Sequence, residues 1–452
     1  MVLAQVYHPQ HNLFNRTEFV RRNASPEQTG LTAKRLVLQA LSDRIDSLGS
    51  NNAPYLQEDA FFVGDLGEMY RQHVLWQKLL PRVKPFYAVK CNPHPTVIKF
   101  LHDLGIGFDC ASRSEIEEVL RLDTDPKRII YAHPCKAPSY IRYAKTVGVQ
   151  RMTFDNADEL HKIKGVFPDA SLLLRIATDD STSHSPLSKK FGADMATVES
   201  LLGLAQELSL NVVGVSFHVG SGASDPTALI KAVQDAYRVF DQAPTFGFNL
   251  HVLDVGGGFC KDTFEMMASS LNRELGIYFP ASSKIEIIAE PGRYYVASAF
   301  TLATNVIARR TAENADYQQK DHMIYVQDGT YGNFSGVIID HEVPTARILR
   351  AGDKILYGTT DADPLLSEEG VLHSIWGATC DGADCVIKST RFKVTLRIGD
   401  WLYFNDMGAY TSSSVTHFNG FPTPNEVTWI CSEADVIDYG KALIWKANEL
   451  KE

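Results

Sequence analysis

Short apolar runs recur along the first two thirds of the chain, and most of them are separated by segments with the period of an amphipathic helix. The runs are rich in β-branched residues and contain few polar ones, which is typical of strands buried on both faces. Eight such runs within about 210 residues predict a (β/α)8 TIM-type barrel, with a doubly wound open sheet as the alternative. The predicted strands lie at about residues 85–90, 107–112, 128–134, 151–156, 171–178, 211–219, 251–257 and 284–289.

The pattern changes near residue 299, where the apolar runs become short and are separated by Gly, Asp and Asn turns. This favours an antiparallel β domain, built as a sandwich or barrel. Before the barrel, apolar residues three and four apart predict helices over 32–48 and 66–80, with a strand at 61–65 between them. The predicted C-terminal strands contain residues 323–327, 346–349, 374–376, 392–396 and 401–404. The predicted units are a polar arm (1–30), a segment that packs on the β domain (31–60), the barrel (61–298) and the β domain (299–452).

Composition limits the classes of function. The chain has 452 residues, of which 44% are hydrophobic and 22% charged, and this length suits roughly two or three domains. Its formal charge of −10 disfavours a general affinity for nucleic acid or anionic membranes. We find no signal peptide and no apolar stretch of about 20 residues, so we expect a cytoplasmic enzyme. The seven cysteines lack paired spacing, which argues against disulfides or a metal site.

Polar residues occupy the carboxyl ends of the predicted strands, and in a barrel these ends face the active site. Turns alone explain Asp and Gly there, but they do not explain a Lys, two His, an Arg and a Glu that each close an apolar strand. Lys90 is the most informative of them, because an ammonium group is costly to bury unless it reaches solvent or forms an imine. The ring contains Lys90, Asp109, His133, Asp155, Arg175, His218, Gly256–Gly258 and Glu290.

Glycine-containing turns follow three of the strands, at Ser221–Gly222, Gly256–Gly258 and Pro291–Arg293. Glycines let backbone N–H groups approach an anion, and Arg293 adds positive charge. Each turn alone could be purely structural, and the spacing does not match a dinucleotide site. A lysine, a phosphate cradle and a carboxylate on one rim together favour pyridoxal phosphate. Glu290 is the candidate for the carboxylate that keeps the pyridine nitrogen protonated, with a helix cap or an ion pair to Arg293 as the alternative.

Seven motifs follow one another in the chain: Phe86–Asn92 (FYAVKCN), Gly107–Ser112 (GFDCAS), His218–Gly222 (HVGSG), Asp254–Phe259 (DVGGGF), Glu290–Tyr294 (EPGRY), Trp376–Gly382 (WGATCDG) and Met407–Tyr410 (MGAY). In order and spacing they resemble eukaryotic ornithine decarboxylases, from about residue 60 to 430. The resemblance implies an alanine-racemase-like barrel with a C-terminal β domain, pyridoxal 5'-phosphate as the cofactor and a homodimer with shared sites. The implied reaction is the decarboxylation of L-ornithine to putrescine and CO2, in polyamine biosynthesis.

The resemblance also implies roles for single residues. Lys90 would form the Schiff base with the cofactor, Glu290 would contact the pyridine nitrogen, and His218 would stack on the ring. Cys380 of the partner subunit would return a proton to the substrate carbon, although a free Cys is more often a small buried apolar residue. The phosphate would be held by Ser221, Gly256, Gly257, Gly292, Arg293 and Tyr410, and the supporting polar layer would consist of Asp109, Glu115 and Arg175.

Asp340, and Asp381 from the partner subunit, match the acidic residues that receive the distal ammonium group of a diamino acid; for Asp340 the alternative is a turn residue at a strand end. Ile339 departs from the family, which usually has Tyr there, so an aromatic wall and a hydroxyl are missing from the substrate end. Lysine, or a bulkier amino-acid intermediate of specialised, alkaloid-type metabolism, is therefore the alternative substrate. A further alternative is a non-catalytic regulator that binds a protein partner, as antizyme inhibitors do. The resemblance also leaves room for an antizyme-type regulator as a partner.

Overall fold

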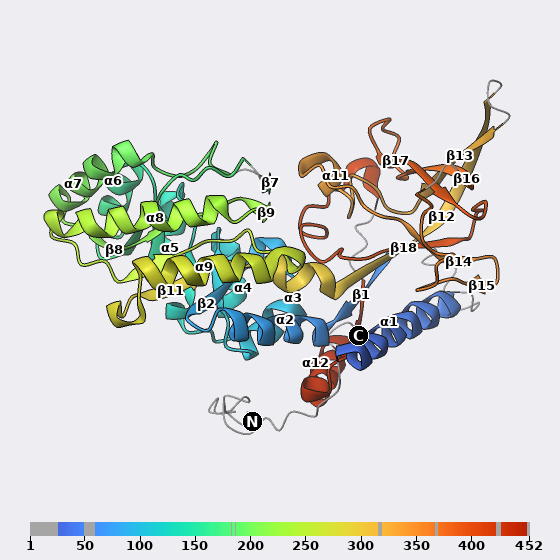
Figure 1. Ribbon diagram of the computed structural model, residues 1–452, viewed down its shortest axis with the longest axis horizontal. Helices are drawn as coiled ribbons and strands as arrows, with labels where there is room; N and C mark the ends of the chain where they lie inside the picture. Colours follow the sequence, from blue (N-terminus) through green and yellow to red (C-terminus); the bar gives the residue numbers. More distant parts are fainter. Residues whose placement is uncertain are drawn as a thin grey trace, which may run out of the picture.

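The computed structural model describes residues 26–48, 59–181, 183–185, 187–314, 319–366, 369–421 and 426–449. A barrel of strands surrounded by helices and a β domain lie side by side (Figure 1). Helix α1 (Pro26–Leu48) lies along the edge of the β domain, and helix α12 (Ile437–Glu449) packs on helices of the barrel. In the described part of the chain, no helix has both the length and the apolar character needed to cross a bilayer.

Eight parallel strands close into the barrel in the order β10-β11-β2-β3-β4-β5-β6-β8. Each pair of neighbours is parallel, as the buried apolar runs predict. The (β/α)8 prediction is therefore confirmed, and the open sheet is wrong. The strands are β2 (Val83–Ala88), β3 (Gly107–Cys110), β4 (Ile129–Tyr131), β5 (Arg151–Phe154), β6 (Ser171–Arg175), β8 (Asn211–Ser216), β10 (Val252–Asp254) and β11 (Glu286–Ala289).

Helices follow the strands and cover the outside of the barrel (Figure 1). Several begin at polar residues that cap them: Ser112 accepts a hydrogen bond from the N–H of Glu115, and Asn156 from that of Glu159. These caps fix where each chain segment leaves the rim. The helices are α2 (Leu66–Leu79), α3 (Pro95–Asp103), α4 (Arg113–Leu120), α5 (Pro138–Thr146), α6 (Ala157–Val166), α7 (Val198–Glu207), α8 (Thr227–Gln242) and α9 (Phe264–Tyr278).

The inside of the barrel has an apolar layer beneath a polar layer. The apolar layer is a small cluster separate from the main core and contains Phe86, Ile130, Leu173, Val213, Val252 and Ile288. Side chains alternate along a strand, so residues two positions further on face the same interior. Two positions further on along three of the strands stand Arg175, Asp254 and Glu290. With them, the buried polar residues at the strand ends are Asp109, Thr153 and Ser216.

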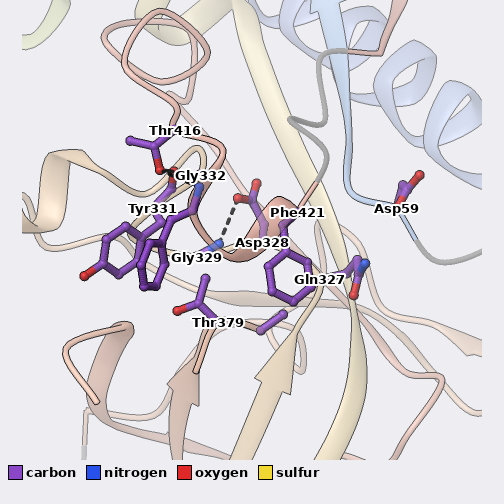
Figure 2. A pocket seen from close by; sticks show the side chains of 11 residues that line it. Asp59, Gln327, Asp328, Gly329, Tyr331, Gly332, Thr379, Thr416 and Phe421 are labelled. Carbon is purple, nitrogen blue, oxygen red and sulfur yellow. Dashed lines mark hydrogen bonds between the residues drawn. The ribbon is translucent and has the colours of Figure 1, made fainter. Parts of the chain in front are cut away.

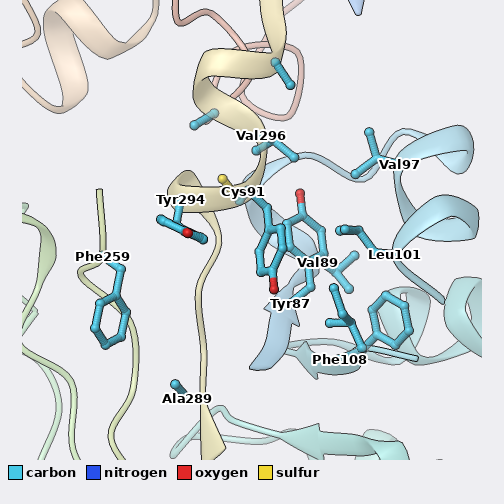
Figure 3. Close-up of a cluster of buried hydrophobic side chains, with 14 of the residues drawn as sticks. Tyr87, Val89, Cys91, Val97, Leu101, Phe108, Phe259, Ala289, Tyr294 and Val296 are labelled. Carbon is cyan, nitrogen blue, oxygen red and sulfur yellow. The ribbon is translucent and has the colours of Figure 1, made fainter. Parts of the chain in front are cut away.

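A 3-10 turn, Val89–Cys91, follows β2 and carries Lys90 at the rim. Tyr87, Val89 and Cys91 are fully buried in the main core; Val89 lies on the side of Leu101, whereas Cys91 lies on the side of Tyr294 (Figure 3). The Tyr87 hydroxyl donates a hydrogen bond to the carbonyl of Asn92 (3.0 Å), which holds the short turn at the strand exit. The two neighbours of Lys90 are buried in the core, whereas Lys90 itself lines the cavity at the carboxyl ends of the strands.

The β domain is one nine-stranded, mainly antiparallel sheet with the central order β15-β14-β18-β12-β13-β16-β17. Strand β1 pairs with β12 and β19; the β1–β19 and β13–β16 pairs are parallel. The strands are β1 (Phe61–Asp65), β12 (Phe300–Asn314), β13 (Gln319–Val326), β14 (Arg347–Ala351), β15 (Lys354–Ile355), β16 (Val371–Trp376), β17 (Cys385–Phe392), β18 (Trp401–Phe404) and β19 (Val427–Ile430).

Three predicted boundaries are wrong. Helix α1 begins at Pro26, within the stretch predicted as a polar arm, whose residues 1–25 lie outside the described residues. Strand β1 was expected to open the barrel unit but belongs to the β sheet, because its backbone pairs with β12 and β19. The run 392–396 is not a strand, since β17 ends at Phe392. Helix α1 contacts β1 and β19 of the β domain, and its Arg44 forms an ion pair with Glu426 (2.6 Å).

Candidate active site

A cavity of about 290 Å³ opens at the carboxyl ends of the barrel strands. It brings together most of the predicted cofactor residues, although they are spread over 320 positions of the sequence (90 to 410). Asp109 and Arg175 lie in the polar layer of the barrel interior, and Gly256 precedes the lining glycines. The lining consists of Ala88, Lys90, His218, Ser221, Gly222, Gly257, Gly258, Phe259, Glu290, Gly292, Arg293 and Tyr410.

Two members of the predicted polar ring hold turns instead of lining this cavity. The Nδ1 atom of His133 accepts a hydrogen bond from the N–H of Cys135 (2.9 Å). A carboxylate oxygen of Asp155 accepts one from the N–H of Gly192 (2.8 Å). These are the turn-forming roles expected of polar residues at strand exits.

Lys90 forms an ion pair with Asp109. The Asp109 side chain is fully buried, whereas 39% of the Lys90 side chain remains accessible. Burial alone would lower the pKa of Lys90, but the negative charge of Asp109 raises it above its ordinary value. Nearby, the N–H of Ala111 donates to Glu115 (2.5 Å), and burial raises the pKa of Glu115. The amine is therefore held as a cation at a known position on the rim.

His218 is an uncharged ring at neutral pH. Burial, and then the positive charges of Arg175 and Lys90, lower its pKa well below the ordinary value. The N–H of Gly220 donates to Nδ1 of His218 (3.0 Å), so in the neutral ring Nε2 carries the proton. A Cβ atom at Gly257 would lie 2.7 Å from Nε2 of His218 and 2.9 Å from the carbonyl oxygen of Glu290. Only glycine permits this close approach.

The phosphate-binding prediction concerns a cradle around Arg293. Nη1 of Arg293 donates to Glu342 (2.7 Å) and Nη2 lies 3.6 Å from Asp340, while Nε and Nη2 make no hydrogen bond within the described residues. A Cβ atom at Gly292 would lie 2.8 Å from Cβ of Cys91. A buried guanidinium with unused donors beside glycines is suited to an anion such as a phosphate.

Tyr410 closes the cradle from the β domain. Its backbone adopts φ +54°, in the left-handed region that a tyrosine rarely occupies. Its N–H donates to the carbonyl of Cys91 (2.9 Å), and its ring centre lies 5.2 Å from Cζ of Arg293. Strained conformations of this kind concentrate at functional sites. The residues present therefore fit a phosphorylated aromatic cofactor: a lysine, an uncharged ring, an acid and an anion cradle line one cavity.

The predicted substrate residues fall into two groups. Asp340 directly follows the short helix α11 (Gly336–Ile339) and approaches Arg293 of the cradle. Cys380 and Asp381 lie on a loop of the β domain, and the described lining of the cavity includes neither of them. Cys380 is exposed, and its N–H donates to Asn419 (2.9 Å). The chain thus does not bring its own Cys380 to its own Lys90.

A second cavity, of about 430 Å³, lies in the β domain beside this loop (Figure 2). Tyr331 lines it, stacks on Phe418 with ring centres 4.5 Å apart, and donates its hydroxyl to Asp381. This hydrogen bond lowers the pKa of Asp381, so the carboxyl group stays ionised. The aromatic pair therefore holds an anionic Asp381 at the surface.

From the sequence alone no role is predicted for Asp384, which the structure places behind the loop of Cys380. It is 1% exposed and accepts hydrogen bonds from the backbone and hydroxyl of both Thr330 (2.7 and 3.0 Å) and Thr379 (3.1 and 2.6 Å). A Cβ atom at Gly329 or Gly377 would lie 2.3 or 2.2 Å from its carboxylate. Asp384 thus anchors the loop that carries Cys380. Its position shortly after the Thr-Cys-Asp-Gly motif could have indicated this role, but the spacing of residues does not reveal which Asp of the loop is buried.

From the sequence no role is predicted for Glu342 either, although its carboxylate forms a closer ion pair with Arg293 than Asp340 does. Its signal is weak, because an acidic residue two positions after Asp340 reads as an ordinary turn residue. With Asp340, it makes the substrate side of the cradle acidic. That side therefore favours a cationic group.

Comparison with known proteins gives a consistent family. Residues 66–297 match the family described as pyridoxal-dependent decarboxylase, pyridoxal binding domain. The ornithine decarboxylase of Neurospora crassa is 54% identical over 421 residues, which cover 89% of this chain and 87% of that protein. The ornithine decarboxylase of Saccharomyces cerevisiae is 47% identical over 409 residues, covering 88% and 87%. The arginine decarboxylase of Paramecium bursaria Chlorella virus bound to agmatine has a TM-score of 0.78 and 34% identity, covering 87% of this chain and 100% of that one.

Proposed function

The chain belongs to the pyridoxal-dependent decarboxylases, and we propose that its reaction is the decarboxylation of L-ornithine to putrescine and CO2. The cavity that joins Lys90, Glu290 and Arg293 carries this proposal, because it combines a reactive amine, an acid and an anion cradle. When bound there, pyridoxal phosphate supplies an electron sink for the pair released when a bond to the substrate Cα breaks. The chain's own residues supply binding, orientation and protons.

Each residue of the cavity has a role that follows from its contacts. Lys90 holds the cofactor covalently, and Asp109 fixes the direction of its side chain. Arg293, with Ser221 and the glycines at 257 and 292, binds the phosphate. His218 presents an uncharged face to the ring, so that no repulsion opposes a protonated pyridine. Glu290 holds a proton at the pyridine nitrogen.

Asp340 is the proposed anchor for the distal ammonium group of the substrate. It lies on the acidic side of the cradle, where Arg293 contacts both Asp340 and Glu342. The direct test is release of CO2 from L-ornithine by purified protein loaded with cofactor. Absence of CO2 release by protein that shows cofactor absorbance would overturn the proposed reaction.

Ile339 favours a second candidate substrate. Its side chain is apolar and 65% exposed at the substrate end, so it offers a longer or bulkier amino acid no hydroxyl partner and little steric limit. Lysine or a larger diamino acid is the alternative. Values of kcat/KM for ornithine, lysine and N-substituted diamino acids decide between the two, because specificity is a ratio of these values. Ornithine far ahead of the others would eliminate the alternative.

We also propose that two copies share their active sites. The proton donor Cys380 and the acidic Asp381 lie on an exposed loop instead of in the cavity of their own chain. Beside this loop, a groove of about 900 Å³ is lined by apolar side chains that include Val337, Ile338 and Trp376. A second copy related by two-fold symmetry would cover the groove and insert each loop into the other copy's cavity.

Mixing two inactive variants tests the sharing of sites. Lys90→Ala subunits retain Cys380, and Cys380→Ala subunits retain Lys90, so a mixed dimer contains one intact site. After dissociation and reassociation at equal concentrations, roughly one quarter of the wild-type activity should return, because half of the dimers are mixed. No recovery in a sample whose mixed dimers are demonstrated would place each site within a single chain.

The cytoplasm is the proposed compartment. All seven cysteines are free in the structure, and free thiols persist in a reducing environment. A non-catalytic regulatory role, controlled through an antizyme-type partner, is disfavoured because the lysine, acid, histidine and arginine of the cavity are all present. Purified protein without the visible absorbance of bound cofactor would revive that role.

A further inference from the structure

Asp254, to which neither the motif comparison nor the proposed function gives a role, lies beside Glu290 in the polar layer of the barrel. Asp254 is the last residue of β10, and Glu290 directly follows the neighbouring strand β11. The N–H of Val255 donates to the carbonyl of Ile288 (2.9 Å), and the N–H of Glu290 donates to that of Gly256 (2.7 Å). Because these bonds continue the sheet beyond both strand ends, the backbone fixes the spacing between the two carboxyl groups.

Both side chains lie in the barrel interior and are shielded from solvent. Asp254 is 0% exposed and Glu290 is 7% exposed, and their side chains are in hydrogen-bonding contact. One oxygen of Asp254, Oδ1, accepts from the N–H of Gly256 (2.9 Å). Apart from Glu290, no donor among the described residues reaches its other oxygen, Oδ2. A buried carboxylate oxygen without a donor is costly, so the partner that remains for Oδ2 is a protonated Glu290.

The charged groups around the pair do not supply another partner for Oδ2 of Asp254. Lys90 is engaged by the carboxylate of Asp109. Arg175 in the same layer lowers the pKa of Asp254 by its charge, Asp109 opposes it, and His218 on the rim is uncharged. Burial first, and then the charge of Asp254, raise the pKa of Glu290 well above its ordinary value, while burial raises the pKa of Asp254 to about 6. Two carboxyl groups in contact cannot both ionise under these conditions.

We propose that Asp254 and Glu290 share one proton at neutral pH and that Asp254 is thereby a positioning residue, holding the Glu290 carboxyl group in the orientation that faces the cavity. The consequence for the reaction rests on the proposed function, in which Glu290 holds a proton at the pyridine nitrogen. The shared proton itself is a property of the protein alone. It can therefore be measured without cofactor or substrate.

Two substitutions separate positioning from simple space filling. In Asp254→Asn, the side-chain oxygen keeps the hydrogen bond from Gly256, so the amide group points to Glu290 and donates to it. Glu290 then becomes the anion and no carboxyl proton remains on the pair. In Asp254→Val, Glu290 has no polar neighbour at this position, so burial keeps it protonated but nothing orients it. Val252→Ala, two residues earlier on the same face of β10, is the control for damage to the barrel interior.

The first measurement is infrared absorption of protonated carboxyl groups in cofactor-free protein at pH 7. Wild type and Asp254→Val should show a band that is missing from Asp254→Asn. The wild-type minus Asp254→Asn difference removes any contribution of Asp328, another buried acid, whose pKa burial raises to about 6. No band in this difference spectrum would overturn the shared proton, whatever reaction the enzyme catalyses.

The second measurement is the dissociation constant of pyridoxal phosphate together with kcat. Asp254→Asn should stay within about 3-fold of wild type, whereas Asp254→Val should lose about 10- to 100-fold in kcat, the usual worth of a hydrogen bond to a charged group. Val252→Ala should lower the melting temperature without this loss. If Asn and Val substitutions reduce kcat equally in folded proteins, Asp254 does not position Glu290. Absence of ornithine turnover in the wild type would instead contradict the proposed substrate.

Discussion

The barrel and the β domain hold their functional residues in opposite ways. In the barrel, Lys90, His218 and Glu290 stand at strand ends whose backbones are tied to one another by the parallel sheet, and the acids behind them are buried. In the β domain, Cys380 and Ile339 are exposed on loops or at a helix end, and a buried acid, Asp384, holds the loop from behind. The predicted cofactor residues thus meet within one chain, whereas Cys380 lies on an exposed loop away from their cavity.

Removal of the lysine is the largest expected effect on the barrel side. Lys90→Ala removes the amine that binds the cofactor covalently, so activity should fall at least about 1,000-fold. Borohydride reduction followed by mass measurement should find no cofactor attached. Lys84→Ala is the control, because Lys84 lies on the same strand but forms a surface ion pair with Glu286 (2.8 Å). If the cofactor were attached to Lys90→Ala in the same yield as to the wild type, another lysine would be the one that binds it covalently.

A methyl group in the cradle should act more weakly than loss of the lysine. Gly257→Ala places a Cβ atom 2.7 Å from His218 and 2.9 Å from a backbone oxygen. Overpacking of this kind costs about 1–3 kcal/mol, so cofactor binding should weaken about 10- to 100-fold. Gly276→Ala in α9 meets nothing within 4 Å and should leave binding unchanged. Equal titration curves for the two variants would mean that the cofactor ring and phosphate do not need this glycine.

The anchor of the Cys380 loop provides the corresponding test of the β domain. Asp384→Ala leaves four donors of Thr330 and Thr379 without their acceptor, so the loop should lose its conformation and kcat should fall about 10-fold. The cofactor dissociation constant should not change, because neither Asp384 nor its two threonine partners line the cofactor cavity. Asp361→Asn, which disturbs only exposed pairs with Lys393 and Lys354, is the control. A parallel loss of cofactor affinity would show that the two regions are not independent.

The smallest expected effect is a difference in pH response. His373 is 1% exposed, its Nε2 accepts from the N–H of Leu396 (3.2 Å), and burial lowers its pKa to about 4. The unfolded chain binds a proton near pH 6.5 that the folded chain does not, so stability falls as the pH drops from about 6.5 toward 4. Between pH 7.5 and 5.5 His373 should account for a loss of about 1 kcal/mol, to which His73 and His218 add because burial lowers their pKa values as well. The share of His373 is the difference between the wild type and His373→Gln. Denaturant unfolding at both pH values measures it.

The acid pair of the barrel should respond with the opposite sign. The folded Asp254–Glu290 pair retains at neutral pH a proton that unfolded carboxyl groups release above about pH 4, so its contribution to stability falls as the pH rises from about 4 through neutral pH. His373→Gln should remove the part of the stability loss toward low pH that is due to His373. Asp254→Asn should remove the loss toward high pH that is due to the acid pair. His251→Gln, at an exposed position, is the control for both. Identical pH slopes in all variants would contradict the assignment of buried groups.

Much of the barrel could be predicted because its signals are local. Apolar runs separated by helical segments marked all eight strands, and the abrupt end of one run at Lys90 marked the rim of the barrel. The β domain was harder. The run 392–396 is apolar but does not pair beyond Phe392, and the apolar strand 61–65 joined the β sheet. An apolar run shows that a strand is buried but does not show which strand it will pair with.

The sequence by itself determined the period of the apolar residues, the identity of the side chain at each strand end and the motifs that carry the family resemblance. Tertiary structure decided which of those side chains meet. Closure of the barrel places β10 beside β11 and so Asp254 against Glu290, and the β domain brings Tyr410 across 320 residues to the turn that holds Lys90. The physical reason is that backbone preference and burial act on neighbours in sequence, whereas the pairing of strands and the sharing of a proton depend on contacts between segments far apart in the chain.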